Sequence, residues 1–332
     1  DDMINALKFM GYTEKSKDYE GPRGVKGPQL TVLPPGTYRI NRYLFEIQDG
    51  ESTDIPTGFV GVVKSNVGEH YKGERILPSN VKETELSVPI VPKGHRGVWK
   101  DVLTPGRYYI NQIAYDVIKI PTRVQTWKYI GGYDRRVIDL EISDDGKIKQ
   151  VERKETIPFD PEVHADRAIV LRVEGWEVPQ DARVQVQVTP ENAPFVVAAV
   201  GDLQQVEDKI ITPNFRSIMR NRIARTVTIE EPVLDDNGLP KKDMDGNVTM
   251  RTVTRPRKVL DLLYNRDKLE EEVAEDLVPE GEKAGLTVQW VRFGDPAVPP
   301  ELLIPQKRTQ LAKQLEATYD QERKSQVARV NT

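Results

Sequence analysis

The residue types that most often carry acid–base or nucleophilic chemistry are sparse in this chain. Its histidines, His70, His95 and His164, stand in three separate turn-like stretches, without a metal-ligand or catalytic spacing to a second histidine or a carboxylate. Cysteine is absent, which excludes disulfides, thiolate catalysis and cysteine-ligated metals. Ser217 lies on a predicted helix, without the strand-turn-helix elbow of a serine nucleophile. We therefore predict a protein that is not an enzyme and has no catalytic residue, cofactor or metal; catalysis at His95 or His164 is the weakest alternative.

One acidic stretch follows the first part of a calcium-loop pattern. Asp243, Asp245 and Asn247 are spaced as early ligands of such a loop. A calcium loop, however, runs for about 12 residues and ends in a glutamate, where this chain has Thr254. We therefore interpret the stretch as a hairpin turn rather than a metal site.

Two stretches of opposite charge are better candidates for function. The basic one carries Lys209, Arg216, Arg220, Arg222 and Arg225, and the acidic one Glu270, Glu271, Glu272, Glu275 and Asp276. Three interpretations are open. The two faces pair between neighbouring protomers, the basic face binds anionic lipid head groups, or both are solvated helix faces. From them we choose four candidate protomer contacts: Arg216, Arg220, Glu271 and Glu275. Nucleic acid is not a predicted partner, because the net charge is −4 and no aromatic residues alternate with the arginines.

The elements that present these charges can be predicted from periodicity and turn residues. An alternating strand is expected at 182–188, and Thr212 and Pro213 are expected to act as N-cap and first residue of a helix. The elements predicted after residue 130, in chain order, are a hairpin from 137 with its turn at 144–146, the strand at 182–188, helices at 190–200 and 212–225, an inserted hairpin at 226–256, a helix at 265–283, a strand at 286–290 and a terminal helix from 299.

A repeated motif marks the first half of the chain. Leu-x-Pro-Gly-x-Tyr-x-Ile-Asn occurs at Leu33–Asn41 and again at Leu103–Asn111, about 70 residues later. Pro followed by Gly is typical of a type II turn, and Tyr and Ile at a spacing of two share one face of a strand. The second copy follows a Gly94-x-x-Gly97-Val turn. The repeat predicts two related β-modules, whose turn residues are Gly94, Gly97, Pro105, Gly106 and Asn111.

The length of 332 residues is enough for two or more domains. We predict a polar lead-in at 1–28, an extra β-module at 29–90, an α/β domain at 91–298 and an assembly helix at 299–332. Strands in the extra module are expected at 38–47, 59–63 and 86–91. The fold class is therefore α+β, with β-modules ahead of an α/β domain.

The terminal helix has a thin apolar stripe. Leu311, Leu315 and Tyr319 recur at a spacing of four, but Arg323 is next in that series. This stripe is too narrow to be buried against a domain core. We interpret the helix as the start of a coiled coil and choose Leu311 and Leu315 as bundle contacts; a solvated terminal helix is the alternative.

Taken together in order, several short motifs resemble the SPFH domain family (band 7, or stomatin, prohibitin and flotillin) over residues 91 to about 330. They are Gly94-His-Arg-Gly97-Val98, Pro105-Gly106, Ile110-Asn111, Arg123-Val-Gln-Thr126, Ile211-Thr-Pro213 with Arg216-Ser217 and Arg220, Asn265-Arg266-Asp267-Lys-Leu269, Gly285-Leu-Thr-Val288 and Pro299-Pro-Glu301. The chain departs from the family pattern in its β-module at 29–90, where relatives carry a hydrophobic segment, and in the hairpin at 226–256.

The resemblance implies a homo-oligomeric scaffold that forms rings or cages on membranes and organises lipid microdomains or restrains membrane proteases. Its implied partners are copies of itself, membrane lipids and a membrane protease. The longest apolar run, Phe195–Val200, is far shorter than the roughly 20 residues that span a bilayer, and the chain begins Asp1-Asp2-Met3. We therefore expect a fragment or mature form that is membrane-associated through an anchor outside this sequence. The alternative function is an adaptor that recruits a membrane protease or another protein without forming large rings.

Overall fold

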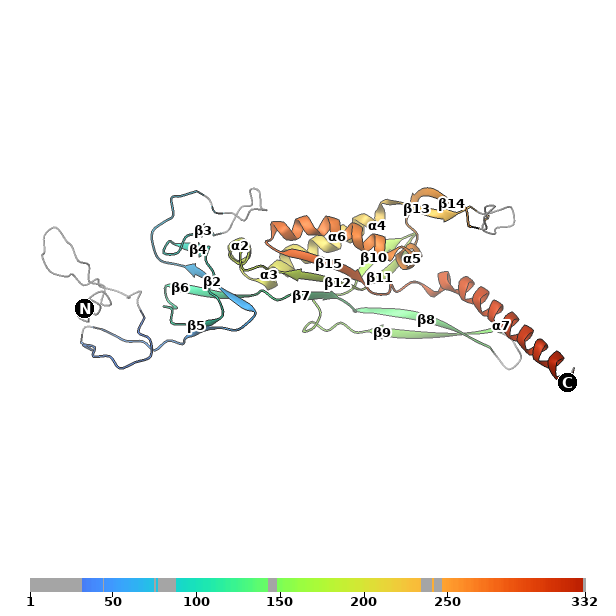
Figure 1. The fold of residues 1–332 in the computed structure, drawn as a ribbon, viewed down its shortest axis with the longest axis horizontal. Helices are drawn as coiled ribbons and strands as arrows, with labels where there is room; N and C mark the ends of the chain where they lie inside the picture. Colours follow the sequence, from blue (N-terminus) through green and yellow to red (C-terminus); the bar gives the residue numbers. More distant parts are fainter. Residues whose placement is uncertain are drawn as a thin grey trace. The chain divides into compact units, whose positions relative to one another are not determined.

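The structure is a computed structural model that describes residues 32–43, 45–74, 76, 88–142, 148–233, 241 and 247–330. It is a mixed α+β fold with several small sheets and a few helices (Figure 1). The chain divides into two compact units. Unit 1 comprises Asp1–Val124, Gln187–Val206 and Gly281–Thr287, and unit 2 comprises Gln125–Val186, Glu207–Glu280 and Val288–Thr332.

Unit 1 is built around a four-stranded sheet with the strand order β3-β4-β2-β6. Its elements are β1 (Thr53–Ile55), β2 (Phe59–Ser65), β3 (Ile90–Val91), β4 (Gly97–Trp99), β5 (Gly106–Tyr108), β6 (Tyr115–Pro121), α2 (Ala193–Ala199) and α3 (Leu203–Val206). Val63, Val91 and Trp99 form a buried cluster, against which Leu103 and Tyr115 pack. The short helix α2 is almost wholly apolar and contacts β2, β3 and β4, so it contributes its buried side chains to this unit.

The predicted division at residue 90 does not coincide with a division between sheets. β2 lies before that boundary, yet it pairs antiparallel with β4 and β6, which lie after it. The strand expected at 86–91 is described only from residue 88 and is a strand at Ile90–Val91. The two β-modules expected from the repeat therefore share a single sheet.

The strand expected at 38–47 is wrong for the described residues of that range, which form turns and irregular backbone. Two of its apolar side chains are not packed against a sheet: Tyr43 is fully exposed and Ile47 is 55% exposed. An apolar run alone could not specify a strand here, because a strand also needs a hydrogen-bonded neighbour.

Unit 2 combines a mixed core with two long hairpins. Its elements are β7 (Gln125–Tyr129), β8 (Tyr133–Ile142), β9 (Ile148–Ile157), β10 (Ile169–Val173), β11 (Trp176–Gln180), β12 (Ala182–Gln187), the π-helical segment η1 (Glu207–Ile211), α4 (Thr212–Ala224), β13 (Thr226–Pro232), β14 (Met250–Pro256), α5 (Asp261–Tyr264), α6 (Arg266–Lys283), β15 (Thr287–Phe293) and α7 (Pro300–Val330). β12 lies between β15 and β7, and α4 contacts β10. The last residue of β12 and the first of β15 belong to unit 1.

Most elements predicted for this half are confirmed. The strand at 182–188 is β12, whose alternate residues Ala182, Val184 and Val186 are buried. The two hairpins are β8–β9 and β13–β14, each paired antiparallel along its full length. The turn predicted at 144–146 and the calcium-like Asp243 and Asp245 lie outside the described residues.

Thr212 is not the N-cap that the sequence predicts. The π-helical segment η1 continues into α4 without a break, and Ile211, at the N-cap position of α4, already has helical backbone angles. The hydroxyl of Thr212 instead lies 3.1 Å from that of Tyr129 on β7. Pro213 cannot donate a backbone hydrogen bond, and a π-helical turn before it accommodates this loss within a continuous helix.

Candidate assembly surface

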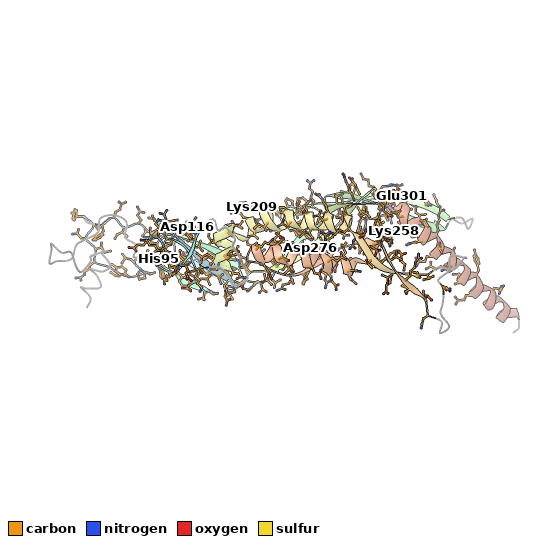
Figure 2. The ribbon with its side chains drawn as sticks, turned by 90° about the horizontal axis from the view of Figure 1, so that it is seen from above. His95, Asp116, Lys209, Lys258, Asp276 and Glu301 are labelled. Atoms are coloured by element: carbon orange, nitrogen blue, oxygen red, sulfur yellow. The ribbon has the colours of Figure 1, made fainter. Side chains whose placement is uncertain are left out.

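The oppositely charged helices α4 and α6 face each other within one chain. Arg222 on α4 donates to both carboxylate oxygens of Asp276 on α6, at 2.5 and 2.6 Å. Further along, the side-chain amide of Asn214 donates to Glu280 at 3.1 Å. Figure 2 shows the two helices side by side, with Asp276 labelled at their contact. Part of the charge that the sequence assigns to a contact between protomers is therefore neutralised inside the protomer.

A buried arginine extends this ionic network. Arg257, only 4% exposed, forms an ion pair with Glu272 on α6, and Arg222 approaches the same carboxylate at 3.9 Å. The hydrogen bond from Arg222 keeps the pKa of Asp276 below its ordinary value, and that bond in turn raises the pKa of Arg222. Each partner is thus held in its charged form, and the network fastens α4, α6 and the segment after β14 together.

The four predicted protomer contacts divide into two groups. Arg216 forms an ion pair with Asp166 at 2.6 Å and donates to the carbonyl of Arg167 at 3.1 Å, so any contact with another protomer would compete with these bonds. Arg220, Glu271 and Glu275 are exposed, and their side chains form no ion pair with another described residue. Of the four predicted contacts, these three are therefore available for an external partner.

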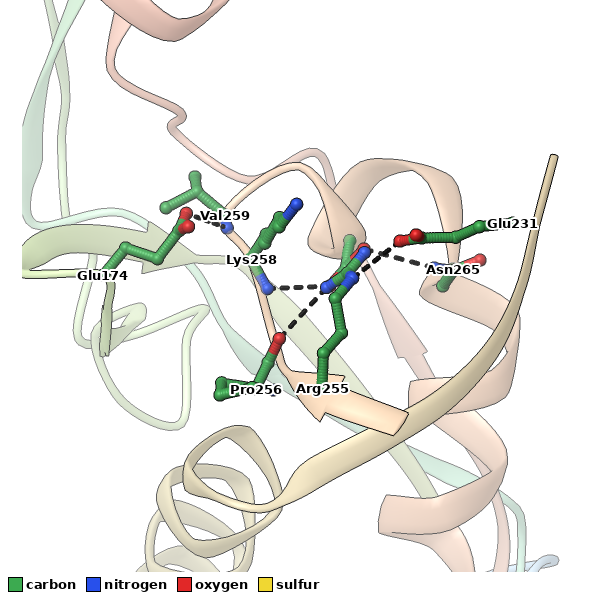
Figure 3. A network of polar contacts seen from close by, with 8 residues as sticks. Glu174, Glu231, Arg255, Pro256, Lys258, Val259 and Asn265 are labelled. Atoms are coloured by element: carbon green, nitrogen blue, oxygen red, sulfur yellow. Dashed lines mark hydrogen bonds and ion pairs between the residues drawn. The ribbon is translucent and has the colours of Figure 1, made fainter. Parts of the chain in front are cut away.

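The inserted hairpin β13–β14 is fastened at its base by a second network, drawn in Figure 3. Arg255 donates to both carboxylate oxygens of Asp261, at 2.8 and 2.9 Å, and also to Glu231 at 2.7 Å. The backbone N–H of Lys258 donates to Asp261 at 2.7 Å. Burial alone would raise the pKa of Asp261, but these hydrogen bonds outweigh it and hold the pKa below its ordinary value.

The same region is connected to the β10–β11 turn. Glu174 has a positive φ of 51° and precedes Gly175 in this tight turn. Its carboxylate accepts a hydrogen bond from the backbone N–H of Val259 at 3.0 Å (Figure 3). The hairpin that looked like an extra from the sequence is therefore integrated into unit 2 rather than loosely attached.

The first two turns of helix α7 contact the rest of unit 2. Glu301 pairs with Arg136 on β8 at 2.7 Å, Gln306 accepts a hydrogen bond from Tyr264 at 2.8 Å, and Lys307 donates to the carbonyl of Ile138 at 3.0 Å. After these contacts, Leu311 is half-buried and its described neighbours at 308–310 and 312–314 are exposed. The side chain of Leu315 lies outside the described residues.

The predicted turn residues occupy a tight loop of unit 1. Gly97 has a φ of 139°, and a Cβ there would meet the carbonyl oxygen of Pro89 at 2.6 Å, which explains the need for glycine. Gly94 also has a positive φ, of 97°. The type II turn expected at Pro105-Gly106 is wrong, because Gly106 has a φ of 157° and already begins β5.

The repeated motif nevertheless has the same local structure in both copies. The hydroxyl of Tyr38 donates to the carbonyl of Pro34 at 2.9 Å, and that of Tyr108 donates to the carbonyl of Thr104 at 2.8 Å. In each copy the ring folds back over the preceding Pro-Gly, and a Cβ on Gly36 would meet the Tyr38 ring at 3.1 Å. At Gly36, which does not have a positive φ, a side chain would therefore crowd this ring, whereas a Cβ at Gly106 would lie 3.7 Å from the Tyr108 ring, an ordinary contact distance.

A further signal in the sequence went unused. Gly58-x-x-Gly61-Val62 has the same pattern as Gly94-x-x-Gly97-Val98. The strands that carry the two patterns, β2 and β4, are neighbours in the sheet, paired at Ser65 and Gly97. A search for the shorter pattern would have indicated that the two modules are partners.

No protein-family model matches this chain, and no curated protein matches it either. The assignment of function therefore depends on the geometry described above and on the motif order.

Other kinds of site have little support in the described part of the chain. It contains no group of three or more histidine, aspartate or glutamate side chains that could hold a metal ion. Its helices include none with the length and apolar character needed to cross a bilayer. His95 forms an isolated β-bridge with Glu69, and its Nδ1 is 3.3 Å from the carbonyl of Glu69. His164 lies on irregular backbone, and its Nδ1 accepts a hydrogen bond from the backbone N–H of Asp160 at 3.4 Å.

Proposed function

We propose that this chain is a non-enzymatic scaffold protein of the SPFH (band 7) type that self-assembles on a membrane. The proposal assigns residues 91–298 to the SPFH domain and α7 to the start of a coiled coil that continues the assembly. Its sequence support is the order of motifs from Gly94 to Glu301. Rings or cages of this kind would organise lipid microdomains or restrain membrane proteins and proteases.

The observation that carries the proposal is the long, largely exposed helix α7. It has 31 residues, and among its described side chains the polar contacts with the rest of unit 2 are made by its first two turns. A polar helix gains little stability alone in water, because most helical stability in proteins comes from packing an apolar face. Leu311 and Leu315 are one helical turn apart, so copies of the helix can pack these two positions against each other as the apolar contact of a coiled coil.

Charged side chains supply a second, lateral contact in the proposal. Arg220 on α4 is free to pair with Glu271 or Glu275 on α6 of a neighbouring protomer, whereas Arg216 is already paired with Asp166. Such a contact between exposed charges weakens as salt screens it. Assembly is therefore expected to be large at low ionic strength and smaller at high ionic strength.

Multi-angle light scattering of the full chain tests the proposal. We expect a large assembly at low salt, which the pair of changes Leu311→Asp and Leu315→Asp reduces to small species. Ala312→Asp with Gln314→Asp is the matched control, because it places the same two charges on exposed positions of the same helix. A monomer at low salt, or equal loss of assembly with the control, would overturn self-assembly. A monomer that still retains a specific protein partner would favour an adaptor instead.

A further inference from the structure

The two copies of the repeated motif end in turns with the same hydrogen bonds. Asn41 accepts a hydrogen bond through its side-chain oxygen from the N–H of Tyr43, and Asn111 accepts one in the same way from the N–H of Ile113, both at 3.0 Å. Each asparagine carbonyl also accepts a bond from the N–H four residues later, that of Phe45 at 3.1 Å and that of Tyr115 at 2.9 Å. The chain thus builds one turn twice, in stretches with different neighbours.

Both turns present a large apolar side chain at the same place, two residues after the asparagine. Tyr43 is fully exposed, and Ile113 is 68% exposed. Single exposed apolar residues are normal on protein surfaces. Here, however, the backbone of each tip is fixed by the asparagine, and the exposed position is equivalent in the two copies. Tyr38 and Tyr109, each 44% exposed, add apolar surface to the first and the second copy.

Positive charge lies beside these tips. Arg39 and Arg42 flank Asn41 in the first copy, and both are exposed. In the second copy Arg107 lies four residues before Asn111 and only 3.8 Å from Asp54, so its charge is partly offset. The nearest carboxylates after the turns are Glu46 and Asp116, five residues beyond each asparagine. The first turn therefore has the stronger positive character.

We propose that these two turns bind the surface of an anionic lipid bilayer, with Tyr43 and Ile113 entering the interfacial layer and Arg39 and Arg42 contacting lipid phosphates. Tyrosine suits that layer because its ring is apolar and its hydroxyl remains hydrated. Arginine next to it adds attraction to anionic head groups. The inference rests on the proposed membrane function and identifies the part of this chain that would touch the lipid.

Contact through two side chains is weak in a single chain. When the apolar surface of one such side chain moves from water into the bilayer, partitioning of the protein onto the membrane increases about tenfold. A single small anchor of this size gives only reversible binding. Many copies held in one assembly bind far more tightly than one, because the later contacts are intramolecular. The turns and the proposed assembly therefore depend on each other for stable attachment.

Sedimentation with vesicles of phosphatidylcholine and phosphatidylserine, compared with pure phosphatidylcholine, tests this contact with the full chain. We expect Tyr43→Ser and Ile113→Ser each to lower binding about tenfold, and Arg39→Gln with Arg42→Gln to lower it only on the anionic vesicles. Val163→Ser, at a position 55% exposed in unit 2, is the matched control and should bind like the unchanged protein.

The absence of cysteine allows a second measurement at single sites. Tyr43→Cys and Ile113→Cys, labelled with an environment-sensitive dye, should show a blue shift on adding anionic vesicles, and Val163→Cys should not. No binding by the unchanged protein, or binding unaffected by the two serine changes, would overturn the inference. Loss of assembly in lipid-free light scattering with either serine change would also overturn it, since the turns would then be contacts between copies. A protein that assembles normally without lipid but does not bind vesicles would contradict this inference and leave the proposal of self-assembly unaffected.

Discussion

Arg255 and Asp261 are joined by two parallel hydrogen bonds, at 2.8 and 2.9 Å, at the base of the inserted hairpin. Asp261 is only 6% exposed, so removal of its carboxylate leaves a cation poorly compensated in a half-buried site. We expect Asp261→Ala to lower the free energy of unfolding by about 3 kcal/mol in urea denaturation. Glu177→Ala, which breaks the exposed pair with Arg172, should cost less than about 1 kcal/mol. Equal losses of stability in the two variants would mean that burial does not strengthen the pair of Arg255 and Asp261.

The same carboxylate gives an acid-dependent contribution to stability. Because the pKa of Asp261 is lower in the folded chain than its ordinary value of 3.8, its contribution is present above that value and is lost as the pH falls below it. Urea titrations at pH 2.5 to 5 should show this loss in the unchanged protein and a shallower slope in Asp261→Asn. An identical slope in the two proteins would contradict the assignment.

Local patterns predicted most elements of unit 2 but not their partners. The valines of β12 alternate with polar residues, and that period suffices to predict a half-buried strand. The pairing of Arg222 with Asp276 could not be predicted, since charge patterns show that two helices are complementary but not whether they meet in one chain or between chains. The strand predicted at 38–47 is wrong for a related reason: the apolar run is present, but a sheet neighbour is not encoded in the stretch itself.

The sequence motif identifies several residues of the candidate site but not what each of them does in the structure. Gly97 and Asn111 were chosen from the motif, and the structure gives each a specific local task. Tyr43 was not chosen, although its place two residues after Asn41 matches Ile113 after Asn111. Exposure of a tyrosine depends on the absence of packed neighbours, which a local pattern does not report.

The contact between α4 and α6 predicts a measurable coupling. Arg222→Ala and Asp276→Ala should each destabilise the chain, and a double-mutant cycle should give an interaction of about 1 to 2 kcal/mol. Arg220→Ala removes an exposed charge from the same helix and should change stability by less than about 0.5 kcal/mol. Measurements at high salt, where assembly is reduced, isolate the contact within one chain. Additive effects of Arg222→Ala and Asp276→Ala would mean that the two side chains do not interact in solution.

Two glycines with similar backbone angles should respond differently to alanine. Gly131 has a φ of 79° and Gly175 a φ of 84°, so alanine has a comparable backbone strain of about 1 kcal/mol at both positions. A Cβ at Gly131 would lie 2.1 Å from the carbonyl oxygen of Pro158, whereas one at Gly175 meets nothing within 4 Å. We expect Gly131→Ala to lower the thermal midpoint far more than Gly175→Ala. Similar midpoints would show that the approach to Pro158 relaxes at little cost.

The π-helical segment before α4 contains a buried carboxyl group with an unusual titration. Glu207 is 8% exposed, and burial, assisted by the charge of Asp208, raises its pKa from an ordinary 4.5 to about 7. The folded chain therefore binds this proton more tightly than the unfolded chain does. Between those two values, stability falls as the pH rises, and above pH 7 the whole penalty of the buried charge is present.

Replacement of that carboxyl group by an amide removes the penalty. We expect Glu207→Gln to raise the free energy of unfolding by about 2 kcal/mol at pH 8 and to change it little at pH 5, where Glu207 is largely protonated in the folded chain. Urea denaturation at pH 5, 6, 7 and 8 measures this, and Asp208→Asn, at an exposed neighbour, should reproduce only a small part of the gain. The pH range in which Glu207 changes stability lies above the range in which Asp261 titrates. The free energy of unfolding also changes with pH in the opposite direction, so the contributions of the two groups can be distinguished. A Glu207→Gln gain that is the same at pH 5 and pH 8 would mean that packing of the amide, and not removal of a charge, stabilises the segment.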